Sequence, residues 1–150
     1  MKDHARLAHE NFKKGYNCAQ AVAIAFAEEM GMGETELAKL ASSFGGGMGK
    51  MREVCGAVSG ALLVYGALRG NSDPEDGEAK KQHYAHVQDF AARFKAEHET
   101  IICRELLKNI ALKKENTSEP EARTPEYYRT RPCVRFVETA ARILEEMLAE

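Results

Sequence analysis

Apolar residues recur at every third or fourth position along almost the whole chain, which is the spacing that one face of an α-helix requires. Val87, Phe90 and Phe94 form one such stripe, and no segment alternates apolar with polar residues as a half-buried strand does. A chain of 150 residues can bury a core without disulfides or a metal. The sequence therefore predicts one all-α domain over residues 1–150, a bundle of five to seven helices.

The apolar stripes and the residues that begin or end helices predict where these helices lie. We expect them at about 3–14, 18–30, 34–43, 54–68, 74–98, 101–112 and from 132 to near the C-terminus. Asn17 and Asp73 are the expected N-caps of the second and fifth helices. The segment 113–131 is charged, holds two of the four prolines and shows no apolar period, so it is expected to be a long surface loop.

Charge and hydropathy exclude several function classes. With 21 basic and 23 acidic residues, the formal net charge is -2, which gives no attraction to nucleic acid or to an anionic membrane. The N-terminal residues are charged throughout, unlike a signal peptide. The longest apolar run, 54–68, is too short to cross a bilayer. These features predict a cytoplasmic protein that binds neither nucleic acid nor a membrane.

Four glycines precede the helix expected at 54–68. They are Gly45, Gly46, Gly47 and Gly49, and Lys50 and Met51 follow them. A phosphate-binding P-loop needs Ser or Thr after its lysine and a strand before its glycines, and this chain has neither. We therefore expect the four glycines to line a site of another kind. Further along, Gly56 and Gly60 leave one face of this helix almost without side chains, which allows a neighbouring helix to approach closely.

The four cysteines are the main candidates for chemistry. Cys18, Cys55, Cys103 and Cys133 each fall at or near the start of an expected helix. Unpaired amides and the positive end of a helix dipole stabilise a thiolate there and lower the thiol pKa. No C-x-x-C occurs, so any shared site has to be assembled by the fold. Arg52, Arg104 and Arg131 lie within three residues of a cysteine, but among 21 basic residues such neighbours are common.

Three functions remain open for these cysteines. In the first, the protein is a thiol oxidoreductase: Cys55 is the reactive thiolate, Cys18 or Cys133 closes the disulfide, and a redox partner protein or a small thiol restores it. In the second, the same four thiolates hold zinc or an iron–sulfur cluster. In the third, the chain is a non-catalytic helical interaction module in which the cysteines only pack. The helix face at Gly56 and Gly60, which has almost no side chains, would then form the contact between the two copies of a homodimer.

The histidines offer one further candidate site. His83 and His86 are three residues apart on an expected helix, and Asp89 follows three residues later. Such a trio either holds a metal or belongs to a solvated helix face. The other histidines stand among charged residues, and we expect His4, His9 and His98 on the surface.

Five blocks of the sequence, in order, resemble the C-GCAxxG-C-C family of redox-active proteins. They are Gly15–Val22, Phe44–Gly49, Cys55–Gly60, Cys103–Leu107 and Arg131–Cys133. The chain reads Cys-Gly-Ala where the family label spells Gly-Cys-Ala. The resemblance implies a small helical protein that is redox-active through the four cysteines, and it implies no particular substrate.

Overall fold

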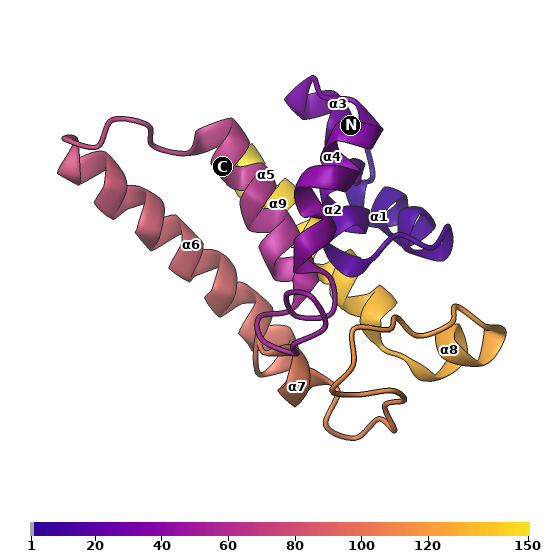
Figure 1. Cartoon of the computed structure of the whole chain (residues 1–150). Coiled ribbons are helices and arrows are strands. Elements are labelled where there is room, and N and C mark those ends of the chain that lie inside the picture. Colours follow the sequence, from indigo (N-terminus) through magenta and orange to yellow (C-terminus); the bar gives the residue numbers. More distant parts are fainter. Residues whose placement is uncertain (1) are drawn as a thin grey trace.

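The computed structural model describes residues 2–150 (Figure 1). Within this range the chain forms nine α-helices and one 3-10 helix, and it contains no strand. The helices are α1 (His4–Lys13), α2 (Cys18–Ala25), α3 (Ala27–Met30), α4 (Glu34–Ala41), the 3-10 helix η1 (Ser42–Phe44), α5 (Gly56–Arg69), α6 (Gly77–His98), α7 (Cys103–Leu106), α8 (Pro125–Thr130) and α9 (Cys133–Ala149). The predicted all-α fold is confirmed, with more helices than the five to seven expected.

Short helices account for the difference in number. The helix expected at 18–30 divides at Phe26, whose backbone leaves the helical region at φ -107° and ψ 17°. The segment 113–131 is not loop throughout, because α8 lies inside it. Thr124 begins α8 by accepting the backbone N–H of Tyr127 at 3.1 Å, and Pro125 occupies the first helical position. These are local capping signals, and a search for apolar stripes misses them.

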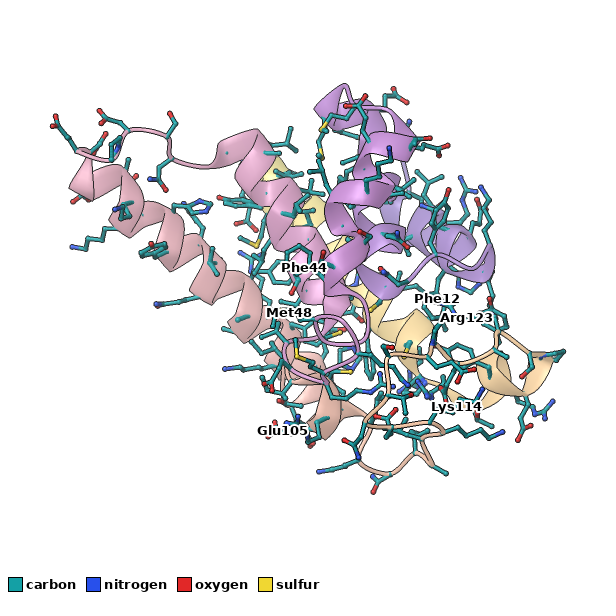
Figure 2. All side chains as sticks on the ribbon, in the orientation of Figure 1. Phe12, Phe44, Met48, Glu105, Lys114 and Arg123 are labelled. Atoms are coloured by element: carbon teal, nitrogen blue, oxygen red, sulfur yellow. The ribbon has the colours of Figure 1, made fainter. Side chains whose placement is uncertain are left out.

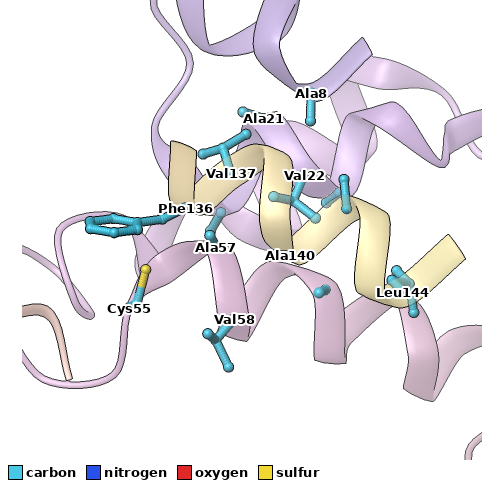
Figure 3. Close-up of a cluster of buried hydrophobic side chains, with 14 of the residues drawn as sticks. Ala8, Ala21, Val22, Cys55, Ala57, Val58, Phe136, Val137, Ala140 and Leu144 are labelled. Carbon is cyan, nitrogen blue, oxygen red and sulfur yellow. The ribbon is translucent and has the colours of Figure 1, made fainter. Parts of the chain in front are cut away.

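Helix α2 lies at the centre of the bundle, as its nearly uniform apolar character requires. It packs against α1, α5 and α9, and α4 covers another side. Figure 3 shows small side chains from three helices meeting there, among them Val22 of α2, Ala57 of α5 and Ala140 of α9. Small residues let these helices approach closely, and this holds the N-termini of α2, α5 and α9 near one another.

The close approach expected at Gly60 is confirmed, and it is a contact within the chain. A Cβ on Gly60 would lie 2.5 Å from the carbonyl oxygen of Ala19 and 2.9 Å from its Cα. Any side chain at this position would therefore push α5 away from α2. The energetic cost of glycine in a helix, about 1 kcal/mol relative to alanine, is offset here by helix packing.

Helix α6 starts later than expected. Asp76 is its N-cap and accepts the backbone N–H of Ala79 at 2.9 Å, whereas Asp73 caps only the preceding turn. Its buried side chains are Phe90 and Phe94, in the C-terminal half. Figure 1 shows the N-terminal half diverging from α5 and α9. No helix within residues 2–150 combines the length and the apolar character that crossing a membrane requires.

The expectation that His4 lies on the surface is wrong. Its side chain is buried and stacks on the ring of Phe26 at 4.0 Å. Nε2 lies 2.5 Å from a carboxylate oxygen of Glu29, and Nδ1 lies 2.6 Å from one of Glu145. The two carboxylates satisfy both ring nitrogens, so the imidazole can be buried while it joins α1, α3 and α9.

Candidate functional site

The four cysteines line one cavity, which has a volume of about 70 Å³. Cys18 is the first residue of α2, Cys55 is the N-cap of α5, and Cys103 and Cys133 are the first residues of α7 and α9. The prediction that each cysteine stands at a helix start is therefore confirmed. All four are free thiols: Cys55 and Cys103 are buried, and the other two are partly exposed.

A short antiparallel pairing of two loops brings Cys55 and Cys103 together. The Cys55 N–H donates to the carbonyl of Ile101 at 2.7 Å, and the Cys103 N–H donates to the carbonyl of Glu53 at 2.6 Å. Val54 pairs with Ile102 between them. One bridge of this length has no alternating pattern, so the sequence does not reveal it. Figure 3 shows Cys55 at the end of the core cluster where Phe136 also lies.

The absence of a side chain at Gly56 makes room for the sulfur of Cys18. A Cβ on Gly56 would lie 2.4 Å from the Sγ of Cys18 and 2.7 Å from the carbonyl oxygen of Phe44. Asn17 is the expected N-cap of α2, and it holds the start of this helix, where Cys18 lies, in place. The Asn17 side chain accepts the Gln20 N–H at 2.8 Å, and the Gln20 side chain accepts the Asn17 N–H at 3.0 Å.

Of the four glycines expected to line the site, Gly46 lines the cavity. The other three do not line it, and they allow the close contacts and the turn of the loop instead. A Cβ on Gly45 would overlap the side chain of Asn17, and one on Gly47, at φ +72°, would overlap the backbone of Arg52. Gly49, at φ +57°, only allows a left-handed turn. The loop therefore bends tightly enough to carry Arg52 into the cavity wall.

Arg52 joins the site through its guanidinium group. Its Nη1 donates to the sulfur of Cys103 at 3.7 Å, while Nε and Nη2 donate to the two carboxylate oxygens of Glu115 at 2.8 and 3.0 Å. This bidentate pair anchors the segment between α7 and α8 over the cavity. Proximity to a cysteine in sequence hinted at Arg52, but that signal did not distinguish it from Arg104, whose side chain is exposed.

Two further arginines complete the wall, Arg131 and Arg123. Arg131 is buried, pairs with Glu121 and lies over the ring of Tyr127 at 5.0 Å. Arg123 makes no ion pair within the described residues 2–150. Its guanidinium stacks over Phe12 at 4.2 Å and donates to the backbone carbonyl of Phe12 at 3.0 Å. The two labelled residues lie next to each other in Figure 2. No sequence signal singled out Arg123, which is not a close sequence neighbour of any cysteine.

The expectation that helix starts lower the thiol pKa is wrong for three of the cysteines. Burial raises the pKa of Cys55 well above its ordinary value, and the charges of the other thiols add to the shift. Burial also raises the pKa of Cys103, although the hydrogen bond from Arg52 acts against it. Desolvation of its sulfur raises the pKa of Cys133 to about 11. Loss of hydration outweighs the helix dipole at these positions, and α7 is only one turn long.

The charge of Cys18 acts on all three of these thiols. Among the cysteines, it is the one that most strongly raises the pKa of Cys55, of Cys103 and of Cys133. Cys18 is also partly exposed, whereas Cys55, which the sequence favoured as the exposed nucleophile, is only 4% exposed.

No three His, Cys, Asp or Glu side chains within residues 2–150 are arranged to hold a metal ion. The trio considered on α6 serves other contacts. His83 and His86 lie against the ring of Tyr65, with centroids 5.7 and 5.9 Å apart, and Asp89 accepts two hydrogen bonds from Arg93.

The comparison with known families identifies one match. Residues 16–147 match the family described as "Putative redox-active protein (C_GCAxxG_C_C)". The matched range includes all four cysteines and the three arginines of the cavity. No curated protein and no solved structure matches the chain.

Proposed function

Because the chain belongs to the C_GCAxxG_C_C family, we propose that it is a thiol oxidoreductase that exchanges disulfides through its cysteine cluster. One observation carries the proposal: all four thiols line the same small cavity. Cysteines that served only as packing would have no reason to gather from four helix starts around an open space. The lining combines apolar side chains with the cations of three arginines, which suits a thiolate attacking a bound sulfur.

Cys18 is the attacking thiol in this scheme. It is partly exposed, and it begins an eight-residue helix whose N-terminus favours a negative charge. Cys55 and Cys103 are buried with raised pKa values, so they are poor candidates for the first attack. The partly exposed Cys133 closes the disulfide.

The reaction proceeds in two exchanges. The Cys18 thiolate attacks one sulfur of a substrate disulfide, a new S–S bond forms, and the other half of the substrate leaves as a thiolate and takes up a proton. The Cys133 thiolate then attacks the Cys18 sulfur, which forms the Cys18–Cys133 disulfide and releases the second half as a thiol. Two protein thiols are oxidised, and one disulfide is reduced to two thiols.

The electrostatics of the cluster order these two steps. A charged Cys18 raises the pKa of Cys133, so the two thiols do not ionise together. Once Cys18 is in the mixed disulfide its charge is gone, and the nearby Arg131 lowers the pKa of Cys133. Cys133 is therefore easier to ionise in the mixed disulfide than in the reduced protein, although desolvation, the largest cause of its raised pKa, remains.

The proposal also covers the reduction of the Cys18–Cys133 disulfide and the cellular compartment. A dithiol redox protein or a small thiol reduces the Cys18–Cys133 disulfide by the same exchange in reverse. The cytoplasm fits this role, because thiol reductants there keep cysteines reduced.

Disulfide mapping after reaction with bis(2-hydroxyethyl) disulfide tests the proposal. The reduced protein should release two equivalents of 2-mercaptoethanol and carry a Cys18–Cys133 bond in the peptide map. Cys18→Ser should abolish the release, and Cys133→Ser should stop at one equivalent with the mixed disulfide on Cys18. Release that is unchanged in Cys18→Ser, or no release from the folded wild type, would reject the proposal.

The two alternatives predict different results in the same samples. If the four thiolates held zinc or an iron–sulfur cluster, anaerobically purified protein would contain stoichiometric metal and the thiols would react only after chelation. A metal site is not favoured, because no three His, Cys, Asp or Glu side chains within residues 2–150 are arranged to hold a metal ion. If the cysteines only packed, in a homodimeric interaction module for example, each serine variant would change stability alone.

A further inference from the structure

The wall of the cysteine cavity carries an excess of positive charge. Arg52, Arg123 and Arg131 line it, and no acidic residue of the described chain does so. Glu115 and Glu121, which do not line the cavity, neutralise Arg52 and Arg131. Arg123 has no such counter-ion within residues 2–150, so one guanidinium in the cavity lining has no carboxylate partner.

Arg123 keeps donors for a further partner. Nη1 donates to the carbonyl of Phe12 at 3.0 Å, and Nη2 donates to the carbonyl of Tyr16 at 2.8 Å. Nη1 also approaches the hydroxyl of Tyr128 at 3.3 Å. A guanidinium has five N–H groups, so Nε–H and one N–H of Nη2 remain. The rings of Phe12, Tyr127 and Tyr128 lie 4.2, 5.0 and 5.7 Å from the guanidinium carbon, and this apolar surrounding strengthens an electrostatic interaction with the remaining donors.

The cavity is also selective in size. Its volume of about 70 Å³ exceeds the roughly 10–15 Å³ that a single water needs. It is far smaller than the roughly 300–1,000 Å³ of pockets that enclose a drug-sized ligand. Such a space accepts the reacting end of a small molecule.

We infer that the substrates of this site are small disulfides that carry an anionic group, and that Arg123 binds this group while Cys18 attacks the neighbouring sulfur. The inference rests on the function proposed above and specifies its substrate class. The exchange balances as before: an anionic disulfide is reduced to two anionic thiols while Cys18 and Cys133 are oxidised.

Three disulfides of one skeleton test the inference, because they differ only in the charge of the end groups. Bis(2-sulfonatoethyl) disulfide is a dianion, bis(2-hydroxyethyl) disulfide is neutral, and cystamine is a dication. Each rate with the folded protein is divided by the rate with the protein unfolded in urea, which removes the intrinsic reactivity of the reagent. The normalised rates should fall from dianion to neutral to dication, with at least a tenfold span at low salt (about the lower limit for electrostatic steering).

Added salt and matched variants then test whether the preference for the anionic reagent is electrostatic and depends on Arg123. The span should shrink at 1 M salt, where the screening length falls to about 3 Å. Arg123→Gln should remove most of it, and Arg123→Lys should retain more. Lys13→Gln is the matched control: Lys13 lies over the ring of Tyr128 nearby at 4.3 Å but does not line the cavity, so the span should be unchanged.

The outcomes separate the inference from the function on which it rests. Equal normalised rates for the three reagents, a preference for cystamine, or equal losses in Lys13→Gln and Arg123→Gln would overturn the anionic substrate class and leave the thiol chemistry intact. No internal disulfide with any reagent would reject the chemistry itself. If Arg123→Gln does not fold, the salt dependence of the wild type and Arg123→Lys decide the question.

Discussion

Gly56 leaves open the space that the sulfur of Cys18 occupies: a Cβ at Gly56 would lie 2.4 Å from that sulfur. The glycine next to Cys55 along the chain thus controls the position of a different cysteine, on another helix. The C-G-A order at 55–57 therefore has a steric reason. The residue after the N-cap cysteine of α5 has to be glycine for α2 to bring its own cysteine to the cavity.

Replacing this glycine tests the relationship. Gly56→Ala should lower the free energy of unfolding by about 1–3 kcal/mol, the usual cost of overpacking, and should change the alkylation rate of Cys18. Gly66→Ala is the control in the same helix, because nothing lies within 4 Å of its added methyl group. It should raise stability by up to about 1 kcal/mol. Urea denaturation and mass spectrometry of alkylated peptides measure both, and equal stability of the two variants would contradict the finding.

Alkaline pH should destabilise the reduced protein through Cys133. Its pKa rises from the ordinary 9.0 to about 11 in the folded state, so the folded protein holds its proton longer than the unfolded chain does. This contribution is fully present below pH 9 and is lost as pH rises toward 11, by about 3 kcal/mol at most. Urea denaturation between pH 8 and 11 measures it. Cys133→Ala should show a shallower decline, and an identical slope would contradict the raised pKa.

Removing the guanidinium of Arg52 should make Cys103 harder to ionise. Burial raises the pKa of Cys103, and the hydrogen bond and charge of Arg52 partly oppose this. In Arg52→Gln the alkylation of Cys103 should therefore shift to higher pH. Arg104→Gln, which removes an exposed cation at the adjacent residue, should leave the profile unchanged. A shift to lower pH in Arg52→Gln would show that opening the cavity matters more than charge.

The buried imidazole of His4 should stabilise the bundle more than an exposed histidine does. His4→Gln loses the two carboxylate contacts and the stack on Phe26, which should cost about 1–3 kcal/mol. His9 is partly exposed and contacts one carboxylate, that of Glu138 at 2.9 Å. His9→Gln should cost less than about 1 kcal/mol. Thermal or urea unfolding compares the two, and similar losses would show that the His4 contacts contribute little.

The sequence alone established the helical class, the main helices and the position of each cysteine at a helix start. These features depend on neighbouring residues: apolar spacing specifies a helix face, and Asn17 specifies a cap through a contact three residues away. The small helix α8 was missed although its cap is local, because a search for apolar stripes does not detect the signal of Thr124 and Pro125. The break at Phe26 was missed as well.

Only the tertiary structure decided what the cysteines share and how they ionise. The bridge between Val54 and Ile102 brings Cys55 and Cys103 together, the open position of Gly56 admits Cys18, and neither feature leaves a periodic pattern in the sequence. The position of Arg123 in the cavity lining and the burial of Cys55 both depend on contacts between residues far apart along the chain. Thiol pKa values follow the loss of hydration, which is set by how the whole chain packs, so helix position alone predicted their direction wrongly.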